Sequence, residues 1–82
     1  MPRYYFDFDD GLLATRDEHG HECESLADVR RQALTALPAI VGDDPLDRDH
    51  SDFVVNVRDE DGRYVFRAVI SVSAGWLSGR RP

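Results

Sequence analysis

Residues 53–73, FVVNVRDEDGRYVFRAVISVS, decide the fold of this chain. The stretches on both sides of the acidic segment 59–62 are rich in valine and aromatic residues and are therefore strand-like. The Asp-Gly step at the end of that segment fits the tight turn of a β-hairpin. We therefore predict strands at 53–58 and 64–73. The alternate residues that would share one face of the second strand are Tyr64, Phe66, Ala68, Ile70 and Val72.

The beginning of the chain shows the same alternation. Tyr4, Phe6 and Phe8 would lie on one face of a strand, with acidic and other polar side chains between them. An Asp-Asp-Gly turn after them allows the chain to fold back as a second hairpin. The predicted segments are a strand at 3–9, a turn at 9–11, a strand at 12–16, a turn at 17–20 and an extended piece at 21–24.

Between the two hairpins, the sequence has the spacing of an amphipathic helix. Ser25 and Asp28 resemble a capping box, in which the hydroxyl accepts a backbone hydrogen bond and the acid suits the helix dipole. Pro38 removes one hydrogen bond, so the helix either ends just before it or kinks and continues to Val41. In both cases Gly42 is suited to end it. The apolar positions are Leu26, Val29, Ala33, Leu37 and Ile40.

The predicted order is therefore hairpin, helix, hairpin. Two hairpins can join into one antiparallel sheet, and a single helix then has only that sheet to pack against. We predict an α+β fold of ββαββ order, with an antiparallel sheet of two hairpins and one amphipathic helix on one face. Residues 1–77 would form a single domain with one small core, and residues 78–82 a flexible polar tail.

One helix covers only one face of such a sheet. The uncovered face would combine large apolar side chains with arginines, a mixture more typical of an interface than of a solvated surface. We therefore predict a homodimer, or binding of another protein, through this open face. The simpler alternative is that these apolar residues are scattered singly, as on many monomers. The predicted partner-binding residues are Tyr5, Val54, Arg58, Val65, Arg67 and Val69.

Charge and hydropathy argue against several classes of function. The net charge is −6, and the dispersed arginines form no basic stripe, so no nucleic-acid partner is expected. Arg3 and Asp7 interrupt any apolar run of a signal peptide. The longest uncharged stretch, 68–79, is too short to span a membrane. We expect a cytoplasmic protein without a membrane partner.

His19, His21 and Cys23 form an H-x-H-x-C pattern, the basis of a competing hypothesis. On a strand they would share one face, and imidazole and thiolate are zinc ligands. The alternative function is therefore a small zinc-binding protein or a metal-dependent enzyme. Gly20 within the pattern indicates a turn instead, with exposed histidines and a half-buried cysteine. A single cysteine excludes an internal disulfide and any multi-cysteine metal site.

Two acidic segments could also take part in metal chemistry. Asp7 and Asp9 form a DxD pair, but phosphoryl-transfer enzymes that use such pairs need a parallel sheet, so we interpret these acids as the end of a strand. The loop 43–52 offers Asp47, Asp49 and Asp52 without the glycine and distal glutamate of an EF-hand. Whether that loop binds a cation is left open. We predict no catalytic residue and no cofactor, and favour a chain that is not an enzyme.

Several spaced segments resemble a family of short bacterial proteins of unknown function, whose members typically begin MPRYFF. They are the start MPRYYFD, the Asp-Gly turn after it, the helix entry at 25–33, Ala36-Leu37-Pro38 and the hairpin D-F-x-V-x-V-R-D-x-x-G-R. The resemblance spans residues 1–76 and implies a compact fold, with no functional residues to transfer. A looser similarity to HicB-type antitoxins rests on the aromatic hairpin and the helix entry SLADVRRQAL. It concerns the fold alone, because the chain has no room for the DNA-binding segment that some antitoxins carry.

Overall fold

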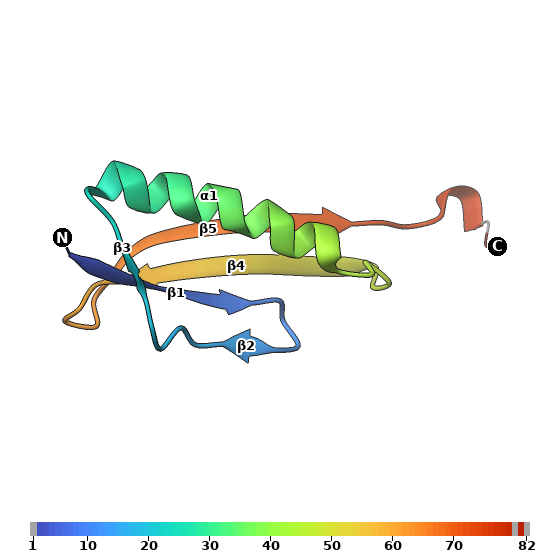
Figure 1. Ribbon diagram of the computed structural model, residues 1–82. Coiled ribbons are helices and arrows are strands. Elements are labelled where there is room, and N and C mark those ends of the chain that lie inside the picture. Colours follow the sequence, from blue (N-terminus) through green and yellow to red (C-terminus); the bar gives the residue numbers. More distant parts are fainter. Residues whose placement is uncertain (1, 80, 82) are drawn as a thin grey trace.

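A computed structural model describes residues 2–79 and 81 of the chain. One long helix lies along one face of an antiparallel sheet (Figure 1). This arrangement confirms the predicted α+β fold, with one short strand added before the helix. The elements are β1 (Arg3–Asp9), β2 (Ala14–Thr15), β3 (His21–Glu22), α1 (Leu26–Asp43), β4 (His50–Arg58), β5 (Tyr64–Ser73) and a 3-10 turn, η1 (Leu77–Gly79).

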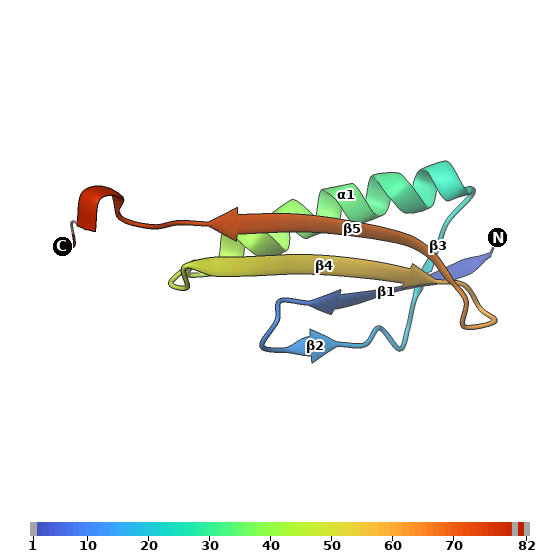
Figure 2. The ribbon, with the colours of Figure 1, turned by 180° about the vertical axis from the view of Figure 1, so that it is seen from behind.

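The two hairpins join through β1 and β4. The spatial order of the strands is β2-β1-β4-β5, and β3 pairs with the beginning of β1. Every pairing is antiparallel, and Phe6 of β1 lies opposite Val57 of β4. β5 forms the outer edge of the sheet beside β4, as the view from behind shows (Figure 2).

β2 is shorter than the strand predicted at 12–16. Leu12 and Leu13 remain in the turn, because the carboxylate of Asp10 accepts hydrogen bonds from both of their N–H groups, at 2.9 and 2.8 Å. Such local side-chain bonds compete with the strand ladder. Only Ala14–Thr15 pairs with β1. The extended piece predicted at 21–24 is present as β3, also in a shorter form.

α1 runs on past Pro38, so the longer of the two predicted helices is the one formed. Ser25 caps its start as predicted, with its side chain accepting from the Asp28 N–H at 3.1 Å. Gly42 does not end the helix; Asp44, with an extended backbone, is the C-cap residue. No helix in the described part of the chain combines the length and the apolar character needed to cross a membrane.

The core lies between α1 and the middle of the sheet. Val29, Ala33 and Leu37 of α1 are at most 1% exposed. Leu26 was predicted to join them but is 62% exposed, because it begins the helix at the end of the helix–sheet interface. The buried sheet residues in this core are Phe6, Phe53, Val55 and Val57, and the partly buried ones on β5 are Phe66, Ala68, Ile70 and Val72.

A β-bulge changes the register at the beginning of β5. Val57 lies opposite Phe66, but the next residue of β4, Arg58, lies opposite Tyr64. Because cross-strand partners share a face, Tyr64 lies on the open face of the sheet and not on the helix side. β4 also begins at His50, three residues earlier than predicted, so the acidic loop 43–52 ends inside a strand.

The tail predicted at 78–82 lies partly outside the described residues, since positions 80 and 82 are not described. Ser78 and Gly79 belong to η1 and are exposed.

Candidate interaction surface

Within the described residues, no helix covers the face of the sheet opposite α1, as predicted (Figures 1 and 2). We call this side the open face. Its residues form rows across β1, β4 and β5, because partners in register share a face. The rows are Tyr5, Arg58 and Tyr64; Asp7, Asn56 and Arg67; and Asp9, Val54 and Val69.

Arg58 lies on the open face but is held within the chain, and its side chain is not free for a partner. The residue is only 8% exposed. Its Nε donates to Asp7 Oδ2 at 2.9 Å and its Nη2 to Asp7 Oδ1 at 3.3 Å. Nη2 also donates to the backbone oxygen of Asp17 at 2.6 Å, and the guanidinium carbon lies 4.7 Å from the centre of the Tyr5 ring. Hydrogen bonding to Asp7 raises the pKa of Arg58 further. The predicted role of Arg58 in partner binding therefore needs correction.

Asp17 ties the segment between β2 and β3 to this ion pair. Its Oδ2 accepts from the Phe6 N–H at 3.0 Å, and its Oδ1 accepts from the N–H groups of His19 and Gly20 at 3.1 and 3.0 Å. Its own N–H donates to Asp7 Oδ1 at 2.9 Å. Burial raises the pKa of Asp17, but the backbone hydrogen bonds outweigh burial and hold the pKa below its ordinary value. The Asp17 carboxylate is thus a structural group.

Gly20 allows this turn to lie close against β1. Its φ is +72°, and a Cβ atom there would lie 2.8 Å from Arg3 Cγ and 2.9 Å from both Tyr4 O and Tyr5 Cε1. Glycine is therefore the residue that fits. The sequence predicted the turn but not the network, because Asp17 and Arg58 lie 41 residues apart and no local pattern connects them.

The exposed apolar part of the open face lies on β5. Tyr64, Val65 and Val69 are 63%, 39% and 49% exposed, and Arg67 beside them is exposed as well. Toward the middle of the sheet, the predicted residues Tyr5 and Val54 are half-buried. Near the β4–β5 hairpin this surface forms a shallow hollow lined by Asn56, Tyr64, Val65, Phe66 and Arg67.

His19, His21 and Cys23 do not come together as a metal site. Cys23 is completely buried in the core, and burial raises the pKa of its thiol, which disfavours the thiolate that zinc binds. The His21 ring packs edge-on against Phe6, with 5.5 Å between the ring centres. Among residues 2–79 and 81, no three His, Cys, Asp or Glu side chains gather in a way that could hold a metal ion. The zinc alternative is therefore not supported.

Two of the acidic side chains that suggested metal chemistry, Asp9 and Asp52, accept hydrogen bonds within a turn and between two strands. Asp9 Oδ1 accepts from the Gly11 N–H at 2.7 Å, as expected for the predicted turn. Asp52 lies on β4, where it accepts from Ser71 Oγ at 2.6 Å and lies 3.2 Å from His50 Nε2. Within the described part of the chain, Asp47, Asp49 and Asp52 do not gather into a group that could hold a cation.

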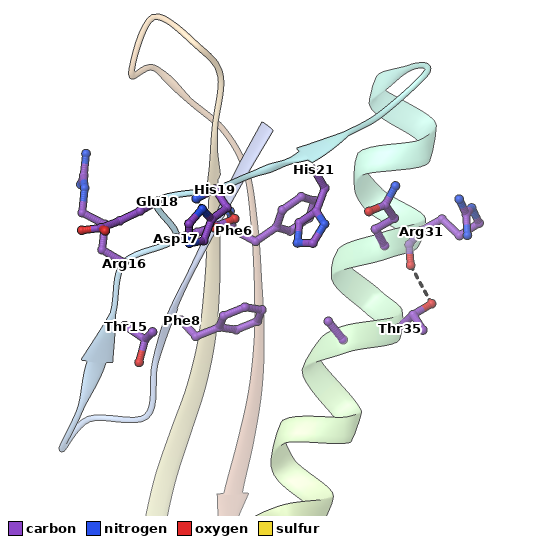
Figure 3. Close-up of a pocket in the computed structure, with 12 residues that line it drawn as sticks. Phe6, Phe8, Thr15, Arg16, Asp17, Glu18, His19, His21, Arg31 and Thr35 are labelled. Atoms are coloured by element: carbon purple, nitrogen blue, oxygen red, sulfur yellow. Dashed lines mark hydrogen bonds between the residues drawn. The ribbon is translucent and has the colours of Figure 1, made fainter. Parts of the chain in front are cut away.

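A groove of about 610 Å³ lies on the helix side of the sheet, between α1 and the segment that links β2 to β3 (Figure 3). It exists because α1 packs over β4 and β5 and covers the helix side of β1 only in part, so that Phe8 remains partly exposed. Phe6 and Phe8 point into it from β1. Alternation in the sequence predicts which face the helix covers, but not over which strands it lies. The walls are residues 15–19 and His21 on one side and Arg31, Gln32, Thr35 and Ala36 on the other.

A family model for a domain of unknown function, DUF6894, matches residues 3–71. The chain belongs to this family. The match begins with β1 and ends within β5, so the DUF6894 domain includes α1 and the sheet except for Val72 and Ser73 at the end of β5. No curated protein and no solved structure matches the chain. Membership of a family of unknown function is thus confirmed, while the typical MPRYFF start and the similarity to HicB-type antitoxins stay predictions.

Proposed function

We propose that this DUF6894 chain is a small interaction module, without catalytic activity of its own, that binds a protein through the open face of its sheet. One observation carries the proposal. Tyr64, Val65 and Val69 are exposed together beside Arg67 on the face that α1 leaves uncovered. Exposed apolar groups combined with tyrosine and arginine are typical of the centres of protein interfaces.

The binding surface consists of Tyr5, Val54, Tyr64, Val65, Arg67 and Val69, which we call the open-face patch. Behind it, the helix side of β4 is completely buried, so the patch lies on a rigid support. Binding to a rigid patch loses little conformational entropy, because its side chains and backbone are already ordered. Arg67 lies opposite Asn56 rather than an acid, so its guanidinium is placed to receive a carboxylate from the partner.

The patch suits a protein partner better than a nucleic acid or a membrane surface. The net charge of −6 repels phosphate groups, and Arg67 is the single arginine in the patch. The same side chains could face an identical patch on a second copy or the surface of a different protein. We place this activity in the bacterial cytoplasm, in line with the sequence.

A double truncation, Tyr64→Ala/Arg67→Ala, tests this function. The wild-type chain, immobilised as bait, captures a partner from an extract of the native cell, and the partner is then purified and titrated by calorimetry. Removing two hot-spot side chains should weaken binding by roughly 100-fold or more. Leu12→Ala/Leu13→Ala is the matched control, because both leucines are exposed in the β1–β2 turn, at the opposite end of β1 from the row that contains Tyr64.

The control variant should bind as the wild type does, and circular dichroism should show both variants folded. Wild-type affinity in the Tyr64→Ala/Arg67→Ala variant would contradict the proposal.

A further inference from the structure

We infer that two copies of this chain pair antiparallel through their β5 edges and form one continuous sheet across a two-fold axis at Val69. This inference is independent of the proposed function, because it uses the backbone edge of β5 and the helix side of the sheet. The open-face side chains of both copies would remain available on the other side.

The outer edge of β5 carries unpaired backbone groups. The Ala74 N–H donates to Asp49 O at 2.8 Å, which places the even-numbered residues of β5 in the ladder with β4. Successive residues of a strand direct their N–H and C=O groups to opposite sides. Since β5 ends the strand order, no strand in the described part of the chain meets the groups that point outward. These groups belong to Arg67, Val69, Ser71 and Ser73.

This edge lacks the features that usually prevent an edge strand from pairing with a strand of another molecule. Such strands are usually short, or carry proline, lysine or a central bulge. β5 has ten residues, without proline, glycine or lysine, and Arg67 is its one charged residue. Its bulge lies at the beginning, opposite Arg58, so the rest of the strand is regular. An unprotected edge of this length is a template for another strand, and a second copy supplies an identical one.

The hydrophobic core is complete at β4 but incomplete at β5. Phe53, Val55 and Val57 are at most 1% exposed, whereas the helix-side residues of β5 are only half-buried. The flank of α1 that lines the groove faces β1, so Leu34, on the other flank and 39% exposed, faces the β5 side. A second sheet and helix beside β5 would bury this surface, and apolar burial is the main driving force of association.

An axis at Val69 gives a favourable register. Arg67 then lies opposite Ser71 of the second copy, whereas an axis at Arg67 would oppose two guanidinium groups. On the helix side, Phe66 meets Val72 of the second copy and Ala68 meets Ile70, so a larger residue always meets a smaller one. The period of two keeps these residues on one face in both copies, so both helices lie on the same side of the combined sheet.

The same register places the segment after β5 beside the second copy. Residues 74–79 lead away from the sheet (Figures 1 and 2), and Trp76 and Leu77 are 63% and 83% exposed. In an antiparallel pair, Ala74 would lie opposite Tyr64 of the second copy and Trp76 opposite its Gly62. The projecting segment would therefore lie along the β4–β5 hairpin of the second copy, where Trp76 could bury apolar area.

Sedimentation velocity over a wide concentration range tests this inference, with Val69→Pro as the decisive variant. The Val69 N–H points to the free edge, and proline is tolerated at such positions of an edge strand. The variant should therefore fold but dimerise about 100-fold more weakly or not at all. Val69→Thr is the matched control, because it keeps both the N–H and the branched shape, and it should dimerise like the wild type.

Leu34→Glu is a second variant, in case proline disturbs folding. It leaves the strands intact, places a good helix former on an exposed helical position, and should also weaken the dimer. Trp76, the one tryptophan of the chain, adds a direct readout. Its fluorescence should shift to the blue as the wild type associates and should stay unchanged in Val69→Pro.

A wild type that is monomeric throughout, or a folded Val69→Pro dimer of unchanged affinity, would overturn the inference. A monomeric chain that still binds its protein partner through Tyr64 and Arg67 would overturn the edge pairing alone and leave the proposed function standing.

Discussion

Arg58 of β4 and Asp7 of β1 form a bidentate ion pair, with 2.9 Å between Arg58 Nε and Asp7 Oδ2. The two residues lie 51 positions apart in the chain. Both side chains are largely shielded, at 10% and 16% exposure. The pair lies where the two hairpins meet, and the Asp17 segment covers it. The ion pair therefore links β1, β4 and the segment around Asp17.

Removing Arg58 should destabilise the fold more than removing the whole pair. Arg58→Met leaves the Asp7 carboxylate shielded without its cation, and we expect the melting temperature to fall by roughly 10 °C. In Asp7→Asn/Arg58→Met no charge is left uncompensated, so the loss should be smaller. Thermal and urea unfolding of the two single variants and the double variant measure the coupling as a double-mutant cycle. Strictly additive losses would show that the two side chains do not act together.

The low pKa of Asp17 predicts weaker stability in acid. A carboxyl whose pKa is lowered by folding stabilises the native state above its ordinary value of 3.8, and this contribution is lost as the pH falls through the lowered pKa. Asp17→Asn should cost about 1–2 kcal/mol at neutral pH, because one backbone N–H loses its acceptor. Urea unfolding at a series of pH values should show the difference shrinking below that ordinary value. Parallel stability curves for the two proteins would contradict this role.

Alternation and capping predicted most of the fold, because both depend on neighbours within a few residues. Phe66, Ala68 and Ile70 share the helix side of the sheet as their spacing indicated, and Ser25 caps the helix. The β-bulge that moves Tyr64 to the open face leaves no such local signal.

The candidate site was predicted less completely than the fold. The open face exists, but alternation alone could not show that Arg58 is buried on it, since the covering segment at Asp17 comes from a distant turn. The H-x-H-x-C pattern misled for a related reason. The positive φ of Gly20 breaks the period of two between His19 and His21. Cys23, just after β3, is buried in the core, and His21 packs on Phe6.

Alanine variants of Gly20 and Gly62 distinguish the cost of backbone strain from the cost of steric crowding by neighbouring atoms. Both have a positive φ, +72° and +84°, but a Cβ at Gly62 would meet nothing within 4 Å, whereas one at Gly20 would clash with backbone and side-chain atoms of β1. Gly62→Ala should cost about 1 kcal/mol from the left-handed conformation alone. Gly20→Ala should cost clearly more, about 2–4 kcal/mol, since β1 must shift as well. Equal losses in urea unfolding would show that the Asp17 turn can move without cost.

Pro38 lies inside α1 on its exposed side, and its replacement should stabilise the chain. Proline cannot donate to the carbonyl of Leu34, and its ring crowds that carbonyl. Pro38→Ala restores the donor and the helix propensity, so the free energy of unfolding should rise by about 1–3 kcal/mol, with more helix seen by circular dichroism. Ala39→Gly, at the adjacent exposed position, is the control and should lower stability by about 1 kcal/mol. A destabilised Pro38→Ala would mean that the helix needs the bend that proline favours to follow the twisted strands β4 and β5, and straightening it would then uncouple Leu37 from the core.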